Sequence, residues 1–347
     1  MQAPDRPVQG PPTLAPRALS PQRLALALAI SVLCGAVFAV RLDWPAVGAA
    51  LVGARWPLVA LASTLTLVHV ALRAVRWRLM LGRTAPPLGT LTWAYFVGVA
   101  AGFAVPASGE LTRAVLLARR TGLRTSYVLG SVAIEKLLDT AAGLGLLAVG
   151  LWQAARLGWL GGAAGAAAVA LGAGILVLAA LVLRAPRAGL PAPPAGLPPR
   201  LAHLWVRLSV ALAEAWVRFA GGVAAVLRLP PAYQAGIGLL TLAAWGSACL
   251  LTVIALAAFD LPADWTLAAV LYGTLLLGLA VPSAPGAVGT YEVTAVFVLQ
   301  GFGLPLAASA AFAVGFHVLT FAPPLLVGAI AYVLRPPGRA ATPIPGC

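Results

Sequence analysis

Four carboxylates lie inside long apolar stretches of this sequence: Glu110, Glu135, Asp139 and Glu292. A charged side chain at the centre of a bilayer costs at least ~2.5 kcal/mol, so each of these groups must face protein, an opposite charge or water. Ionisable groups kept at such a cost are typical of sites that bind a polar group or move a proton. We therefore expect a polar site near the middle of a membrane-spanning bundle.

A polar stripe contains two of these acids. Ser131, Glu135 and Asp139 repeat every four residues, which places them on one face of a helix. Two interpretations remain open. In the first, Lys136 or an arginine from a neighbouring helix neutralises the carboxylates, and the ion pairs lock the bundle. In the second, the stripe binds a lipid headgroup or carries protons.

The other two acids follow Pro/Gly breaks of similar design. Ser108 precedes Glu110, and Thr290 precedes Glu292, by two residues in each case. The two hydroxyl residues are expected to be N-caps, with the glutamates in the first turn of the helix that follows. Capping alone would explain both patterns.

We favour a further role for these helix starts. Their free backbone N–H groups, with Gly109 and Gly289 beside them, can bind an anionic phosphate. Arg113, one turn after the first break, would assist. The glutamates would then organise arginines or exchange protons, because they would repel the phosphate directly.

The histidines and cysteines are assigned ordinary roles. His317, whose place after the second break matches that of Lys136 after the first within one residue, is expected to be a hydrogen-bonded packing residue rather than a relay. His69 is treated in the same way. Three scattered histidines and three cysteines show no metal-ligand spacing. We expect no metal, no cofactor, no catalytic residue and no enzymatic activity.

Three arginines close the second apolar stretch. Arg73, Arg76 and Arg78 flank Trp77, a pattern typical of the end of a span at the membrane surface. We expect them to anchor the helix there. Arg76 and Arg78 would also be placed to contact lipid phosphates.

The composition indicates a helical membrane protein. Of 347 residues, 61% are hydrophobic and 9% charged, with a mean hydropathy of +0.96. A soluble domain cannot bury so much apolar surface, and runs of Ala, Leu and Val without alternation exclude a β-barrel. The net charge of +14 comes from arginines clustered in short loops. This placement favours membrane orientation and anionic lipid contact over nucleic-acid binding.

Six apolar stretches are long enough to cross a bilayer. They are 23–41, 56–74, 126–151, 159–183, 233–258 and 305–334. Two shorter stretches, 88–106 and 267–282, each end at a proline, and arginines on both sides of the first prevent it from crossing. We therefore expect re-entrant hairpins at 88–124 and 267–303, which are tolerated at depth where protein encloses them.

The placement of positive charge orients these elements. With the N-terminus in the cytoplasm, 19 cationic residues lie inside and three outside, as the positive-inside rule requires. The hairpins then enter from opposite faces, which indicates an inverted repeat. We predict an all-α polytopic membrane protein with about six full spans plus two re-entrant hairpins, in the plasma or inner membrane, with both termini cytoplasmic.

The same reading divides the chain into five regions. Residues 1–22 and 335–347 are expected to be disordered tails. Two membrane halves, 23–183 and 233–334, each contain one hairpin. Between them, 184–232 is expected to form a cytoplasmic Pro-rich loop and an interfacial helix.

The motifs resemble a known family. The stretch Gly102-x3-Pro106-Ala-Ser-Gly-Glu110-x2-Arg113, followed by the Ser131–Asp139 stripe, resembles the membrane region of lysylphosphatidylglycerol synthases, a flippase-like family. The run Pro282-x2-Pro285-Gly-x2-Gly289-x2-Glu292 is similar to its second signature. The resemblance covers roughly 23–335. It departs at Lys136, where many relatives have arginine, and in the second turn, where a denser glycine run is usual.

The resemblance implies a function in lipid transport. In the synthases this region is thought to translocate an aminoacylated phospholipid, while a separate soluble domain performs aminoacyl transfer. Since 13 residues follow Leu334, we expect a stand-alone translocator of an anionic lipid: a phospholipid, an aminoacyl-phospholipid or a polyprenyl-phosphate-linked sugar. The alternatives are a membrane partner for a separately encoded glycosyltransferase or lipid synthase, and a membrane-embedded transferase. The oligomeric state stays open.

Overall fold

The computed structural model describes residues 43–104, 108–156, 228–279 and 284–335, with a few isolated positions between 198 and 226. Within these residues every regular element is helical, as the composition predicts. The expected spans 23–41 and 159–183, the interfacial helix and both tails lie outside this part of the chain.

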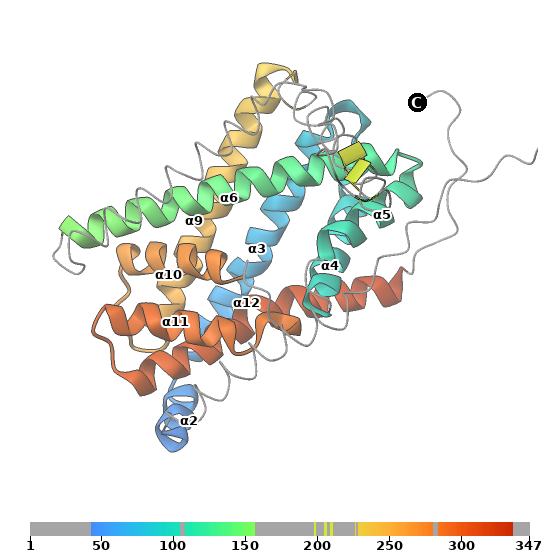
Figure 1. The fold of residues 1–347 in the computed structure, drawn as a ribbon. Helices are drawn as coiled ribbons and strands as arrows, with labels where there is room; N and C mark the ends of the chain where they lie inside the picture. Colours follow the sequence, from blue (N-terminus) through green and yellow to red (C-terminus); the bar gives the residue numbers. More distant parts are fainter. Residues whose placement is uncertain are drawn as a thin grey trace, which may run out of the picture.

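The described elements follow the expected order along the chain (Figure 1). They are α2 (Trp44–Val52), α3 (Trp56–Met80), η1 (Gly82–Thr84), α4 (Leu88–Ala104), α5 (Gly109–Thr121), α6 (Thr125–Arg156), α9 (Pro231–Ala258), α10 (Trp265–Gly278), η2 (Pro285–Ala287), α11 (Thr290–Gly301) and α12 (Leu306–Leu334).

Three of the described helices are long and apolar enough to cross a membrane: α3, α9 and α12. α6 has 32 residues and is therefore about 48 Å long at 1.5 Å per residue. α3 continues past position 74 to Met80, so its predicted end came too early. The helix can continue through Arg73 and Arg76 because both pair with a carboxylate inside the protein.

Two pairs of shorter helices stand where the hairpins were expected. α4 packs against α5, and α10 packs against α11. Glycines allow the close approach within the first pair, because a Cβ on Gly98 would lie 2.8 Å from the carbonyl oxygen of Gly109. In the second pair, a Cβ on Gly278 would lie 2.9 Å from Oγ1 of Thr294. In both pairs, the second helix therefore folds back on the first.

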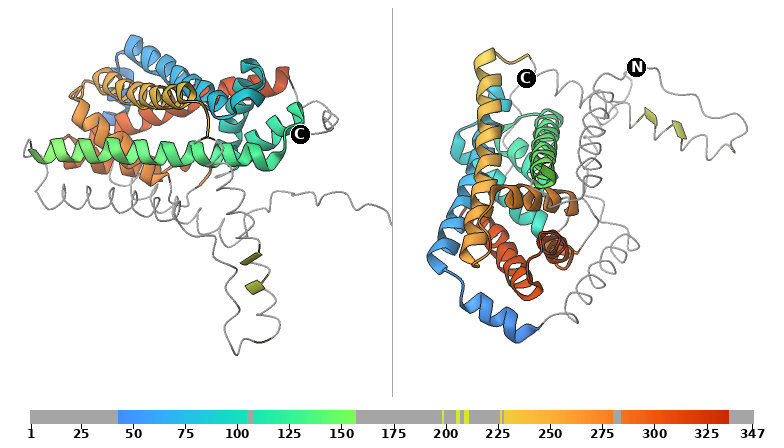
Figure 2. Two further views of the ribbon diagram at one scale, coloured as in Figure 1. Left: turned by 90° about the horizontal axis from the view of Figure 1, so that it is seen from above. Right: turned by 90° about the vertical axis from the view of Figure 1, so that its left-hand side faces the viewer.

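The long helices hold these pairs between them. α3 packs along α9, α6 packs on α10, and α12 packs on α4. Seen from above, α3 and α9 lie side by side on one side of the molecule and α6 lies on the other (Figure 2). The tip of the second pair, η2, contacts α4 of the first. The second break therefore meets the first arm of the first hairpin inside the bundle.

Candidate functional site

A buried cluster of charges joins α3, α5 and α6. Asp139 pairs with Arg73 and, at 2.6 Å, with Arg76. Nη1 of Arg113 lies 2.8 Å from Oε2 of Glu135. The guanidinium groups of the two α3 arginines also lie 3.5 and 3.6 Å from Oε1 of Glu135. Three arginines thus neutralise two carboxylates.

Four members of this cluster are shielded from the surroundings, and the fifth, Arg73, is 23% exposed. Glu135 and Arg76 are 0% exposed, and Asp139 and Arg113 are 4% exposed. Buried charges are tolerated when they are paired and hydrogen bonded. The hydroxyl of Tyr95 accordingly donates to Oε1 of Glu135 at 2.7 Å.

Two aromatic rings complete the shell around Arg113. Its guanidinium carbon lies 4.4 Å from the centre of the Tyr95 ring and 4.9 Å from that of Trp77. A cation over an aromatic face gains electrostatic energy, most of all where water is excluded. Trp77 in turn donates its indole N–H to Ser131 at 2.9 Å. All three members of the polar stripe therefore bond within this region.

The structure distinguishes between the sequence-based interpretations of these residues. Arginines from neighbouring helices, and not Lys136, neutralise Asp139 and Glu135. The anchoring role expected for Arg73 and Arg76 is wrong, because both point into the protein and pair with α6. Arg78 lies outside the cluster and donates weakly, at 3.4 Å, to the carbonyl of Pro86.

Lys136 forms a separate pair nearer the surface. Its Nζ lies 2.6 Å from Oε1 of Glu110, and the two side chains are 53% and 35% exposed. Glu110 lies in the first turn of α5, as expected. This pair therefore borders a space that is open to the outside of the bundle.

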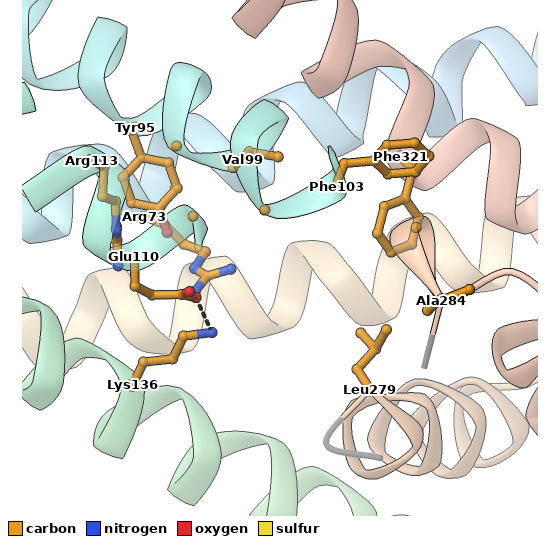
Figure 3. A pocket seen from close by; sticks show the side chains of 15 residues that line it. Arg73, Tyr95, Val99, Phe103, Glu110, Arg113, Lys136, Leu279, Ala284 and Phe321 are labelled. Carbon is orange, nitrogen blue, oxygen red and sulfur yellow. Dashed lines mark ion pairs between the residues drawn. The ribbon is translucent and has the colours of Figure 1, made fainter. Parts of the chain in front are cut away.

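That space is a pocket of about 480 Å³ between the two hairpins. Its charged side is formed by Arg73, Glu110, Arg113 and Lys136, with Tyr95 beside them, and its apolar side is formed by Val99, Phe103, Leu279, Ala284 and Phe321 (Figure 3). Backbone from both tips, at Gly109 and Gly286, completes the wall. The pocket is thus amphipathic.

The charges around the pocket do not cancel. Four cations (Arg73, Arg76, Arg113, Lys136) face three carboxylates (Glu110, Glu135, Asp139), which leaves one positive charge in excess.

One donor of a pocket-lining arginine also remains open. Within the described residues, Nε of Arg73 makes no hydrogen bond, whereas Nη1 of Arg113 is paired with Glu135. Buried donors without partners are rare in folded proteins and call for an explanation. An anion in the pocket would supply both the missing charge and acceptors.

A second polar centre lies in the other hairpin. Nδ1 of His317 lies 2.5 Å from Oε1 of Glu292, whose Oε2 accepts the backbone N–H of Gly289 at 2.7 Å. Neither side chain lines the pocket. His317 is therefore hydrogen bonded, as expected, but to an acid rather than to a neutral packing partner. His69 is buried, with Nδ1 2.8 Å from the carbonyl oxygen of Ala244, as a packing residue would be.

The helix caps differ from the sequence prediction. Ser108 is the N-cap of α5, but its side chain makes no capping bond; Oγ donates instead to the carbonyl of Ala101 at 2.9 Å. Gly289, not Thr290, is the N-cap of α11, and Oγ1 of Thr290 donates to the carbonyl of Ala287. Both hydroxyls therefore donate to backbone carbonyls that precede the helix, and neither caps the N–H groups of its first turn.

Four of the residues singled out from the sequence line the pocket together: Gly109, Glu110, Arg113 and Lys136. Glu135 and Asp139 lie behind them and hold the arginines. Ser108, Gly289, Thr290, Glu292 and His317 do not line it. Sequence reasoning missed Arg73, Tyr95 and the aromatic pair Phe103 and Phe321. A signal did exist for Arg73. Arg73 and Arg76 stand three residues apart, which places them on one face of a helix, and the acidic stripe of residues 131–139 requires counter-charges.

No group of three or more His, Cys, Asp or Glu side chains that could hold a metal ion occurs among the described residues. The charged side chains instead form ion pairs with one another.

Comparison with known proteins agrees with the motifs. No curated protein and no solved structure gives a significant match. A family model described as "Lysylphosphatidylglycerol synthase TM region" matches residues 24–328. The matched range contains both hairpins, the charged cluster and the pocket. The chain therefore belongs to the family of the lysylphosphatidylglycerol synthase transmembrane region.

Proposed function

We propose that this protein moves an anionic lipid between the leaflets of the plasma or inner membrane, and that the pocket between the hairpins binds it. The family links the chain to lipid modification or transport. The observation that carries the proposal is the amphipathic pocket, in which Arg73 and Arg113 stand opposite an aromatic wall and the surrounding ion pairs leave one positive charge in excess. A lipid phosphate fits the first side and the start of its acyl or prenyl chain fits the second.

The charged residues around the pocket have different proposed roles. Arg73 offers its open Nε–H to the phosphate and Arg113 adds its positive charge, while Glu135 and Asp139 hold these arginines in place. Lys136 is paired with Glu110 while the pocket is empty. A half-exposed ion pair contributes roughly 0–1 kcal/mol, so exchange of the carboxylate for a phosphate costs little. Glu110 then serves as a placeholder for the lipid.

The packing pattern supports a two-fold inverted repeat. If α3 is exchanged with α9, α4 with α10, α5 with α11 and α6 with α12, the contacts α6–α10 and α12–α4 exchange places and α3–α9 is retained. We propose six spans and two hairpins on this basis, with both termini cytoplasmic. Rocking of one half against the other would expose the pocket to each leaflet in turn.

The proposal assigns no enzymatic step, metal or cofactor to the chain. A separately encoded glycosyltransferase or lipid synthase would supply or use the transported lipid.

Lipid exchange in reconstituted vesicles tests the proposal. The purified chain is placed in phosphatidylcholine vesicles with a trace of short-chain fluorescent phosphatidylglycerol, and albumin back-extraction measures the outer-leaflet fraction over time. We expect exchange of phosphatidylglycerol at least tenfold faster than that of fluorescent phosphatidylcholine. Lys136→Gln should slow the anionic lipid selectively, and Lys136→Arg should restore it.

Two results would count against it. Equal rates for both lipids, or a Lys136→Gln variant that is folded and unimpaired, would remove the anion site. Co-purification with a transferase, without exchange of any lipid, would favour the partner role.

A further inference from the structure

The buried pair Glu292 and His317 has no role in lipid binding as proposed above. Their side chains are 11% and 9% exposed, and they lie in α11 and α12, away from the pocket-lining residues. Because Glu292 also accepts the backbone N–H of Gly289, it joins a titratable ring directly to the turn at the tip of the second hairpin.

Among the described residues, no other charged side chain pairs with Glu292 or His317. The described helices α2, α4, α9 and α10 contain no Asp, Glu, Lys or Arg. Two tyrosines lie beside the pair: Tyr291, whose ring centre lies 4.4 Å from that of His317, and Tyr272 of α10, which interacts with Tyr291. The titratable groups that α3 and α4 contribute bond elsewhere: His69 with Ala244, Arg73 and Arg76 with Asp139, Arg78 with Pro86 and Tyr95 with Glu135.

The pair has a counterpart of different chemistry in the first hairpin. Glu110 and Glu292 both lie in the first turn of the second arm, and each pairs with the long helix that follows, through Lys136 and His317 respectively. A lysine stays charged near neutral pH. An imidazole gains or loses its proton in that range. The second pair therefore has an imidazole where the first has an ammonium group.

A contact path leads from His317 to the pocket. The ring of Phe321 lies 4.8 Å from that of His317 and 5.8 Å from that of Phe103, and both phenylalanines line the pocket. On the other side, Glu292 bonds Gly289, which follows the pocket-lining residues Gly286 and Ala287. Both routes therefore lead from the pair to residues that line the pocket.

We propose that Glu292 and His317 form a proton-binding site that couples a proton gradient to movement of the anionic lipid. This inference rests on the proposed function and adds its source of energy. One proton binds to the imidazole as the lipid loads, which makes the pair neutral overall, and the N–H bond breaks when the proton leaves on the other side. A proton and a singly charged lipid together carry no net charge, so the pH difference alone drives the exchange.

A pH gradient across the same vesicles tests the coupling. The vesicle interior is set one pH unit more alkaline than the exterior. The wild-type chain should then raise the inner-to-outer ratio of fluorescent phosphatidylglycerol toward about tenfold, the limit for one proton per lipid. Nigericin, which collapses the gradient, should return the ratio to its symmetric value. Pyranine trapped inside should report proton entry that depends on the lipid.

His317→Lys is the matched variant, because it copies the Lys136 pair of the first hairpin. It should exchange lipid but lose the response to the gradient. Where size exclusion shows that it is misfolded, Glu292→Gln takes its place with the same expectation.

The outcomes separate the two proposals. A wild-type chain that exchanges lipid with no response to the gradient overturns the coupling and leaves the transport function standing. A full response in His317→Lys or Glu292→Gln also overturns it. A wild-type chain that exchanges no lipid overturns both.

Discussion

Nζ of Lys136 lies 2.6 Å from Oε1 of Glu110, and this contact ties the second arm of the first hairpin to α6 at the rim of the pocket. The neighbouring acids of α6 have other partners: Asp139 pairs with the arginines of α3, and Glu135 pairs with Arg113 of α5. One helix thus separates an accessible ion pair from a buried one. The two classes of ion pair should respond differently to mutation.

Loss of a buried cation should be costly. Arg76→Met leaves Asp139 with a single partner in a site where Arg76 itself is 0% exposed. We expect the free energy of unfolding to fall by about 1.5–3 kcal/mol, because the buried Asp139 loses a hydrogen bond from a charged donor while Arg73 still balances its charge. Unfolding in mixed micelles titrated with dodecyl sulfate measures the change.

Arg55→Gln is the control for that variant. Arg55 pairs with Asp260 across the ends of α3 and α9, but both side chains are about 60% exposed (62% and 61%). We expect a loss of at most ~1 kcal/mol. Equal losses in the two variants would mean that burial does not decide the strength of these pairs.

A side chain at the second hairpin tip should disturb the pocket. Gly286 has φ +71°, and a Cβ there would lie 2.8 Å from the Phe103 ring. Gly286→Ala therefore adds a clash to a backbone strain of about 1–2 kcal/mol. We expect lipid exchange to fall at least fivefold in the vesicle assay.

Gly303→Ala is the control for the clash, because it introduces backbone strain alone. Gly303 has φ +76°, but nothing lies within 4 Å of the Cβ position. It should lose only the strain contribution of about 1–2 kcal/mol and keep its exchange rate. If both variants slow exchange equally, contact between the hairpin tips has no part in transport.

The first hairpin should depend on one glycine contact. A Cβ on Gly98 would lie 2.7 Å from Cβ of Arg113 and 2.8 Å from the carbonyl oxygen of Gly109. Gly98→Ala should push the arms apart, lower stability by about 1–3 kcal/mol and displace Arg113 from Glu135. Gly89→Ala, on the same helix with nothing within 4 Å, should instead be neutral or stabilising by up to ~1 kcal/mol. Thermal denaturation followed by size exclusion compares the two.

The aromatic donor to the buried carboxylate offers a fourth test. Tyr95→Phe removes the 2.7 Å bond to Glu135 but keeps the ring beneath Arg113. We expect a loss of about 1.5–3 kcal/mol, typical of a hydrogen bond to a charged group. Tyr127→Phe, which removes a 3.1 Å bond to the carbonyl of Leu81, should lose about 1 kcal/mol. A Tyr95→Phe variant as stable as the wild type would show that Glu135 finds another donor.

Much of this architecture was predictable because it depends on local properties of the chain. Apolar runs of sufficient length become helices, since every backbone polar group in lipid must be bonded internally. The Pro/Gly breaks predicted at 106 and at 282–289 interrupt those runs in the sequence, and the described helices end and restart on either side of them: α4 ends at Ala104 and α5 begins at Gly109, and α10 ends at Gly278 and α11 begins at Thr290. The four-residue spacing of Ser131, Glu135 and Asp139 also fixed their common face in advance, and all three bond to the same region.

The choice of partners was not local. Arg73 is 66 residues from Asp139 in the chain, and Phe103 meets Phe321 across the bundle. Arginines near the end of a span can lie at the membrane surface or pair with a buried acid. The packing of α3 decides between these two positions, because it directs Arg73 and Arg76 toward α6. The sequence by itself determined the helices, the breaks and the presence of acids that need counter-charges. Tertiary packing alone decided which cation each acid receives, and so which acids are held inside and which remain at the pocket, because ion pairing depends on distances between helices that the chain brings together only when it folds.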